Sequence, residues 1–297
     1  MAARIIDRST GHDSFWTEAW RLRDSATLPV LLRGLVFGLF ALAVWLLDST
    51  TETPIGIEIT PYELAGAALS LLLVLRTNAG YDRWWDARKL WGGIVNQSRN
   101  LVIASSAYGP REREWRRRFA RWTVAFAHVC RRSLRNERDL PEVAALVGAE
   151  EAARIAAADH MPSYVASVLA ELLAEALGKD QFDRYAFLQA ERERAALVDH
   201  IGGCERIQKT PLPRAYSVQI RRFIYVFLAA TPFALVLQIG WLTPLATMLV
   251  AYPILALDEI GAELQYPFSP RSLNHLPLDE ICSTIERNLL ELAERDA

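Results

Sequence analysis

Long apolar runs lie at both ends of the chain, and a longer, mostly polar segment separates them. The first run covers residues 28–47 and is interrupted only by Arg33. A helix of about 20 apolar residues can cross the hydrocarbon core of a bilayer, so this run predicts a membrane-spanning helix. Twenty-seven mostly polar residues precede it and no small-residue cleavage pattern follows it, so a signal peptide is not expected.

Three further apolar runs follow at 61–75, 223–240 and 241–257. The run at 61–75 is too short to cross alone, so we expect it to extend into its polar continuation. The last two are separated by the turn signal from Gly240 to Pro244 and predict a tight helical hairpin. The chain is therefore expected to be an all-α membrane protein with four transmembrane helices.

The distribution of Lys and Arg predicts the orientation. The loop at 48–60 has no Lys or Arg, whereas basic residues cluster before the first run and after the second. By the positive-inside rule the loop at 48–60 lies outside and both termini are cytoplasmic. The expected location is the inner (plasma) membrane, which the chain crosses several times. The predicted organisation, folding as one integrated unit, is a cytosolic segment at 1–27, transmembrane helices 1 and 2 at 28–75, a helical cytosolic region at 76–217, transmembrane helices 3 and 4 at 218–258, and a cytosolic segment at 259–297.

The polar middle of the chain has apolar residues at helical spacing and no alternating strand pattern. The predicted helices cover 82–107, 111–136, 141–158, 162–177 and 180–207. Arginines cluster at 111–138, but acidic residues are interleaved with them. Mixed charge of this kind favours a solvated or inter-subunit salt-bridged face over a phosphate-binding one.

Composition narrows the class of protein. The chain of 297 residues is 52% hydrophobic and 23% charged, with a formal net charge of -2. These values fit neither a disordered chain nor a polybasic nucleic-acid binder. Cys130, Cys204 and Cys282 have no paired spacing, so they predict small buried residues and neither a disulfide framework nor a metal site.

An enzyme is not expected, and neither is a cofactor. The best candidate for metal chemistry is His200 with Cys204 and Glu205, because an i, i+4 pair shares one helix face. A His and a Cys on a packed helix explain the same pattern more simply. His128 and Cys130 are weaker candidates, because residues two apart diverge on a helix.

The run at 61–75 carries a stripe of apolar residues at helical spacing, namely Leu64, Ala67, Leu71 and Leu75. Small flanking residues allow close contact between helices. In a symmetric bundle such a stripe could line a narrow hydrophobic pore that gates by dewetting. The residues alone favour a simpler alternative, in which the stripe packs against a neighbouring helix.

Several segments resemble the signature segments of the bestrophin family, in its bacterial branch: RTNAGYDRWWDARKLWGGIVNQSRNL, PLPRAYSVQIRRF, LDEIGAELQYPF and LPLDEICSTIERNLLEL. The resemblance extends over about residues 15–292. It implies a pentamer of four-span subunits around one axial pore, with a helical cytosolic region that continues the ion path. The signature residues, with expected structural or interfacial roles, are Arg76, Asn78, Tyr81, Arg83, Trp84, Trp85 and Trp91.

The resemblance implies that the pore neck is lined by Ala67, Leu71 and Leu75. These three residues also belong to the apolar stripe. The family tends to have bulkier Ile or Phe residues there, so Ala67 should leave the outer end of the neck wider. Leu212, between Pro211 and Pro213, matches the family's cytosolic constriction. The alternative for Leu212 is a loop leucine packed at the start of the third span.

Animal bestrophins resemble the chain up to Pro267 and Phe268 and then carry a run of aspartates that forms a calcium clasp. A calcium site needs several carboxylate or carbonyl oxygens together, and this chain instead has the segment SPRSLN at 269–274. We therefore expect no calcium gating through such a clasp. The nearby Asp258, Glu259 and Glu263 predict a membrane-proximal polar face.

The expected function is passive conduction of small monovalent ions. An apolar neck carries no charge that could select between cations and anions. This selectivity must therefore come from charged or dipolar groups outside the neck. The resemblance implies chloride for animal members and monovalent cations such as sodium for the bacterial branch, and we favour cations. The alternatives are an anion channel, a secondary transporter and a scaffold without transport. The expected partners are monovalent ions, membrane lipid and further copies of the chain, without nucleic acid.

Overall fold

A computed structural model describes residues 27–295 of the chain. All its regular elements within this range are helices, which confirms the predicted all-α class. The predicted cytosolic segment at 1–27 lies, apart from Thr27, outside the described residues.

The chain divides into two compact units. Within the described residues, the apolar unit comprises 27–77 and 215–260, and the polar unit comprises 78–214 and 261–295. Each is built from segments that are far apart in the sequence. That the two fold as one integrated unit stays a prediction.

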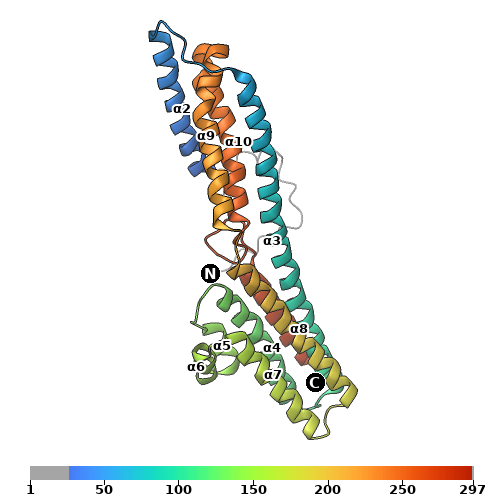
Figure 1. Ribbon diagram of the computed structural model, residues 1–297. Helices are drawn as coiled ribbons and strands as arrows, with labels where there is room; N and C mark the ends of the chain where they lie inside the picture. The colour runs from blue at the N-terminus through green and yellow to red at the C-terminus, as the bar shows by residue number, and fades with distance from the viewer. Residues whose placement is uncertain (1–26, 296–297) are drawn as a thin grey trace. The chain divides into compact units, whose positions relative to one another are not determined.

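The apolar unit contains α2 (Thr27–Thr50), the first part of α3 (Ile59–Tyr108), α9 (Arg214–Ile239) and α10 (Thr243–Glu263), with the short 3-10 helix η1 (Gly240–Leu242) between the last two. The four long helices lie side by side (Figure 1). Each contributes to one buried apolar cluster, which consists of Val30, Leu69, Leu73, Ile220, Ile224, Phe227, Leu228, Ala251 and Leu255. Burial of these side chains against one another holds the unit together.

Three stretches are long and apolar enough to cross a membrane, at Leu28–Thr50, Ile59–Tyr108 and Arg214–Glu263. The third stretch contains both α9 and α10, as expected for a helical hairpin. Gly240 stands in the turn with φ of 51°, a conformation that glycine adopts without a steric penalty. Pro232 and Pro253 lie inside α9 and α10 without ending either helix.

Helix α3 is one unbroken helix of 50 residues. The short run at 61–75 does extend into its polar continuation, but a separate helix at 82–107 is wrong. No proline interrupts the link between them, so the backbone hydrogen bonds continue through it. Gly80 lies in this link. A Cβ atom added there would lie 3.1 Å from the carbonyl oxygen of Gly261, so a larger residue would push α3 away from the backbone at Gly261.

The polar unit has the rest of α3 together with α4 (Arg113–Leu134), α5 (Pro141–Val147), α6 (Ala149–Ala157), α7 (Met161–Gly178), α8 (Arg184–Lys209) and α11 (Leu278–Arg295). Helix α4 is central, because it packs against α5, α7, α8 and α11 (Figure 1). Its residues are buried almost without interruption from Phe119 to Arg131. An apolar core around α4 is what a water-facing helical unit requires.

Two expectations for the polar unit differ from the structure. The single helix predicted at 141–158 is two helices, because Gly148 has φ of 99° and ψ of 153°, which no helix can accommodate. Helix α11 was not predicted, although its buried residues repeat every three or four positions. They are Leu278, Cys282, Ile285, Leu289 and Ala293.

Candidate functional site

The three predicted neck residues lie on the part of α3 that belongs to the apolar unit. Leu71 is 61% exposed and Leu75 is 51% exposed, and Ala67 is exposed as well. Leu69 and Leu73, in contrast, are buried in the unit's core. No described helix of the same chain therefore covers the stripe, and the alternative of packing within one chain is not supported.

A buried ion pair fixes which side of α3 faces the unit. Arg76 is only 1% exposed and pairs with the buried carboxylate of Asp258 on α10. Nε of Arg221 on α9 lies 3.1 Å from the other oxygen of that carboxylate. Removing one partner of a buried pair would leave an uncompensated charge, so this cluster holds α3 in a rotation that leaves Leu71 and Leu75 outside.

This cluster corrects the expectation of a polar face near the membrane. Asp258 does not face solvent, and Glu259 accepts a hydrogen bond of 2.7 Å from the guanidinium of Arg33 on α2. The reason is that the cation partners come from other helices, α2, α3 and α9, and sequence spacing does not reveal them. Arg33 remains about half exposed in this pair.

Three of the signature residues hold α3 within the polar unit. Arg83 donates hydrogen bonds of 2.6 Å and 2.7 Å to the carbonyl oxygens of Ile207 and Thr210 at the end of α8. A cation at this position satisfies helix carbonyls that otherwise lack partners. Trp84 donates from Nε1 to the carbonyl of Asn274 at 2.7 Å, and Trp91 is fully buried.

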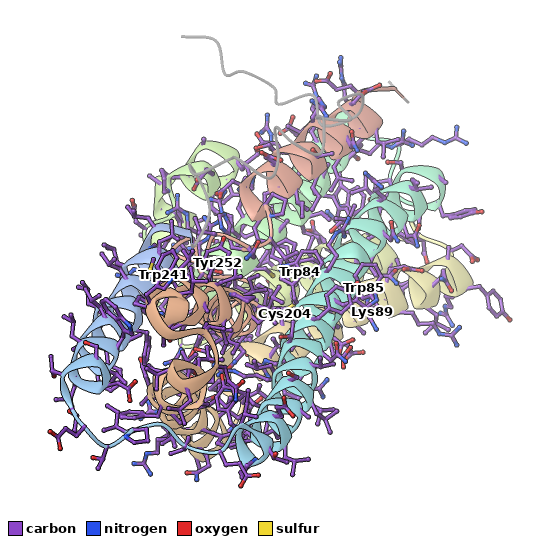
Figure 2. All side chains as sticks on the ribbon, turned by 90° about the horizontal axis from the view of Figure 1, so that it is seen from above. Trp84, Trp85, Lys89, Cys204, Trp241 and Tyr252 are labelled. Atoms are coloured by element: carbon purple, nitrogen blue, oxygen red, sulfur yellow. The ribbon has the colours of Figure 1, made fainter. Side chains whose placement is uncertain are left out.

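The other signature residues beyond Arg76 lie on the outside of α3. Asn78, Tyr81 and Trp85 are exposed. The ring of Tyr81 stacks on that of Trp85 with centroids 6.4 Å apart. The ring of Tyr81 lies at the same distance, 6.4 Å, from that of Trp84. Figure 2 labels Trp84, Trp85 and Lys89 along this stretch of α3. The signature thus combines residues that anchor α3 with residues on a face that the described chain leaves uncovered.

Leu212 lies in the non-helical link between α8 and α9, flanked by Pro211 and Pro213. It is half-buried. A proline on each side restricts the backbone angles of this link.

The segment that replaces the calcium clasp connects α10 to α11. Ser272 donates to the carbonyl of Glu263 at 3.2 Å, and Asn274 donates to the Glu263 carboxylate at 2.9 Å. These hydrogen bonds tie the segment to the end of α10. Among the described residues, no group of three or more His, Cys, Asp or Glu side chains has the arrangement of a metal site.

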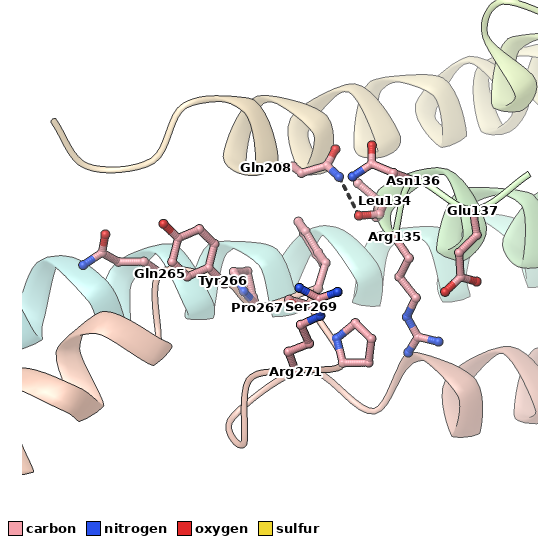
Figure 3. A pocket seen from close by; sticks show the side chains of 12 residues that line it. Leu134, Arg135, Asn136, Glu137, Gln208, Gln265, Tyr266, Pro267, Ser269 and Arg271 are labelled. Atoms are coloured by element: carbon pink, nitrogen blue, oxygen red, sulfur yellow. Dashed lines mark hydrogen bonds between the residues drawn. The ribbon is translucent and has the colours of Figure 1, made fainter. Parts of the chain in front are cut away.

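The same segment borders a pocket of about 460 Å³, which also includes the end of α4 and Gln208 of α8. Gln208 donates to the carbonyl of Leu134 across one side of it (Figure 3). Arg135 and Arg271 both line the pocket. Arg135 is not free to bind an anion there, because it already forms two hydrogen bonds with Asp279, of 3.0 Å and 2.7 Å.

The later part of the arginine cluster is salt-bridged within the chain, which differs from the expected solvated or inter-subunit face. The earlier arginines, Arg111, Arg113, Arg118 and Arg121, are exposed, as expected for a solvated face. Arg131 is buried and lies 2.7 Å from Glu142 and 2.9 Å from Asp279. Arg132 pairs with Glu142 as well. Burial raises the pKa of Glu142, but hydrogen bonds from Arg132, the backbone and Arg131 outweigh this and bring the pKa down to about 2. The acidic partners lie on α5 and α11, at distances along the chain that pattern analysis does not connect.

The weak metal candidates are part of the packed interior. Burial raises the pKa of Cys204 to about 12, so this thiol stays protonated and is a poor metal ligand. Glu205 pairs with His160 at 2.6 Å and does not pair with His200. Burial lowers the pKa of His128, and its Nε2 lies 2.9 Å from the Glu286 carboxylate.

The model of a family described as bacterial and fungal bestrophin proteins matches residues 7–291. The chain belongs to the bestrophin family. A protein of *Escherichia coli* K12 named voltage-dependent anion channel-forming protein YneE is 34% identical over 255 residues, which is 86% of this chain and 83% of that protein. A protein of *Ralstonia nicotianae* with the same description is 36% identical over 284 residues, covering 92% of this chain and 90% of that protein.

A crystal structure of a bacterial bestrophin homologue from *Klebsiella pneumoniae* has a similar fold. The TM-score is 0.82 at 28% sequence identity, and the match covers 89% of this chain and 97% of that one. Together with the long apolar helices, the family assignment makes this bestrophin a membrane protein.

Proposed function

We propose that this bestrophin is an ion channel that conducts small monovalent ions passively through an axial pore. The relatives named as channel-forming proteins support transport by a pore. In the proposed channel, α2, the first part of α3, α9 and α10 are the four spans of each subunit. Both termini are cytoplasmic, the membrane is the inner (plasma) membrane, and five copies surround the axis.

The exposure of Leu71 and Leu75 is the observation that carries the proposal. Large apolar side chains on a helix need either lipid or another protein surface to cover them. Copies of the same helix arranged around an axis would cover them and form a narrow apolar neck. Such a neck resists wetting and can act as a hydrophobic gate. Ala67 would make its outer end wider, and Leu212 would form a second, cytosolic constriction.

Shortening the neck side chains tests this proposal. We expect Leu71→Ala and Leu75→Ala to raise single-channel conductance in planar bilayers about twofold or more, because a wider neck is easier to hydrate. Leu39→Ala is the matched control, since Leu39 is an equally exposed leucine on α2. Unchanged currents in both α3 variants would remove these residues from the conduction path.

The sign of the conducted ion needs a separate measurement. We propose monovalent cations such as sodium, and the alternative is an anion channel, which the names of the relatives favour. Reversal potentials in a sodium chloride gradient distinguish the two, because they shift toward the equilibrium potential of the permeant ion. A secondary transporter would instead give slow, saturable flux without single-channel steps.

A further inference from the structure

The uncovered face of α3 does not end at the neck. Residues three or four apart share one side of an α-helix. Starting from Leu71, every residue at this spacing is exposed well into the polar unit's part of the helix. These residues are Leu71, Leu75, Asn78, Asp82, Trp85 and Lys89.

Asp82 is the first charged residue on this face after the neck. It lies seven residues beyond Leu75, which is roughly 10 Å along the helix axis at about 1.5 Å per residue. This separation is close to the Debye length of about 8 Å at physiological salt. A charge there still acts on an ion that leaves or enters the neck.

No other charge nearby on this face cancels Asp82. Asp82 forms no ion pair with any described residue, whereas Lys89 is neutralised by Asp86, with Nζ and Oδ1 2.8 Å apart. The nearest cation in sequence is Arg83, and Arg76 and Arg88 are each six residues from Asp82. Six residues turn an α-helix by about 240°, so Arg88 leaves α3 on another side than Asp82. Arg76 and Arg83 are engaged elsewhere. Arg76 is buried against Asp258, and Arg83 donates to the carbonyls at the end of α8. Within the described residues, Asp82 is therefore the carboxylate on this face that has no ion-pair partner.

We propose that Asp82 determines the sign of the conducted ion. The inference rests on the proposed pore. When copies of α3 surround an axis, their Asp82 carboxylates form a ring at the inner mouth of the neck. A ring of carboxylates concentrates cations and repels anions. In this arrangement the neck limits the conductance, and the ring of carboxylates determines whether cations or anions are conducted.

Neutralising the ring tests the inference. We expect Asp82→Asn to lower the ratio of sodium to chloride permeability at least about threefold. This corresponds to a change in local potential energy of roughly half a kT per unit charge, because the potential acts on the two ions with opposite sign. Asp82→Lys should lower it further and favour chloride. Asp199→Asn, which removes an exposed carboxylate from α8, is the matched control and should leave the ratio unchanged. An unchanged ratio in Asp82→Asn channels would overturn the inference.

Cysteine modification provides a second test that does not depend on how well the lysine variant folds. The three native cysteines are buried, so wild-type channels should not respond to methanethiosulfonate reagents. In Asp82→Cys channels, a negatively charged reagent should restore cation preference and a positively charged one should reduce it further. If modification of Cys at this position leaves the permeability ratio unchanged, Asp82 does not face the ion path.

These outcomes separate the inference from the proposed function. An absence of single-channel currents in the wild-type protein would refute the channel itself. Currents that respond to Leu71→Ala but not to any change at Asp82 would leave the channel intact and refute only the role of Asp82.

Discussion

The apolar unit and the polar unit are both all-helical, but they place their apolar side chains in opposite ways. In the apolar unit Leu39 of α2 is 57% exposed, and many other large apolar residues are exposed with it. In the polar unit Leu169 of α7 is 0% exposed, within a large apolar core. The two units are therefore built for different solvents, one for hydrocarbon and one for water.

The units also differ in their ion pairs. The apolar unit buries Arg76 and Asp258 among apolar helices, where an unpaired charge is very costly. The polar unit has a more open network, in which Glu142 and Asp279 stay partly exposed beside Arg131. The carboxylates of Glu142 and Asp279 therefore keep contact with water, whereas that of Asp258 is buried.

The largest effect is expected from breaking the ion pair in the apolar unit. Asp258→Asn leaves the Arg76 charge buried without a counter-charge, and we expect a loss of about 3–5 kcal/mol of stability. Thermal unfolding of the detergent-solubilised protein measures it. Glu259→Gln is the control, because its partner Arg33 is about half exposed, and a pair of that kind contributes below about 1 kcal/mol. Equal melting temperatures for the two variants would contradict the distinction between the pairs.

A matched pair of leucines tests the difference in solvent directly. Leu169→Ala removes a fully buried side chain and should cost about 2–5 kcal/mol, since it leaves a cavity. Leu39→Ala removes an exposed side chain and should cost less than about 1 kcal/mol in detergent or lipid. Thermal unfolding of both variants measures the difference. A Leu39→Ala variant as unstable as Leu169→Ala would mean that α2 is covered by protein.

The smallest effect is expected from acidification of the polar unit. The pKa of Glu142 is about 2, below its ordinary value of 4.5. Its contribution to stability is therefore complete above about pH 4.5 and is lost as the pH falls toward 2. Thermal unfolding between pH 7 and pH 2.5 should show Glu142→Gln less stable than wild type at pH 7, with the difference closing at low pH. A difference that stays constant with pH would contradict the role of the Glu142 charge.

Much of the fold could be predicted, because periodicity is a local property. Helical spacing predicted α4, α7 and α8 to within a few residues. The apolar runs predicted that α2, α9 and α10 exist, but α9 begins nine residues before its run and α10 ends six residues after its run, because polar turns continue both helices. The errors concern where a helix breaks, because a single residue can end a helix and the absence of a break leaves no signal in the sequence. Gly148 splits the helix expected at 141–158, and no break separates the two helices expected within α3.

The sequence by itself determined that the chain is helical, that it has apolar runs of membrane-spanning length, and that its segments resemble bestrophins. These follow from spacing and composition along the chain. Only the tertiary structure decided that Asp258 neutralises Arg76 and that Arg131, Arg132 and Arg135 pair within the chain. It also decided that the described residues leave one face of α3 uncovered from Leu71 to Lys89. Contacts between helices distant in sequence depend on how the helices rotate against one another, and no local pattern encodes that rotation.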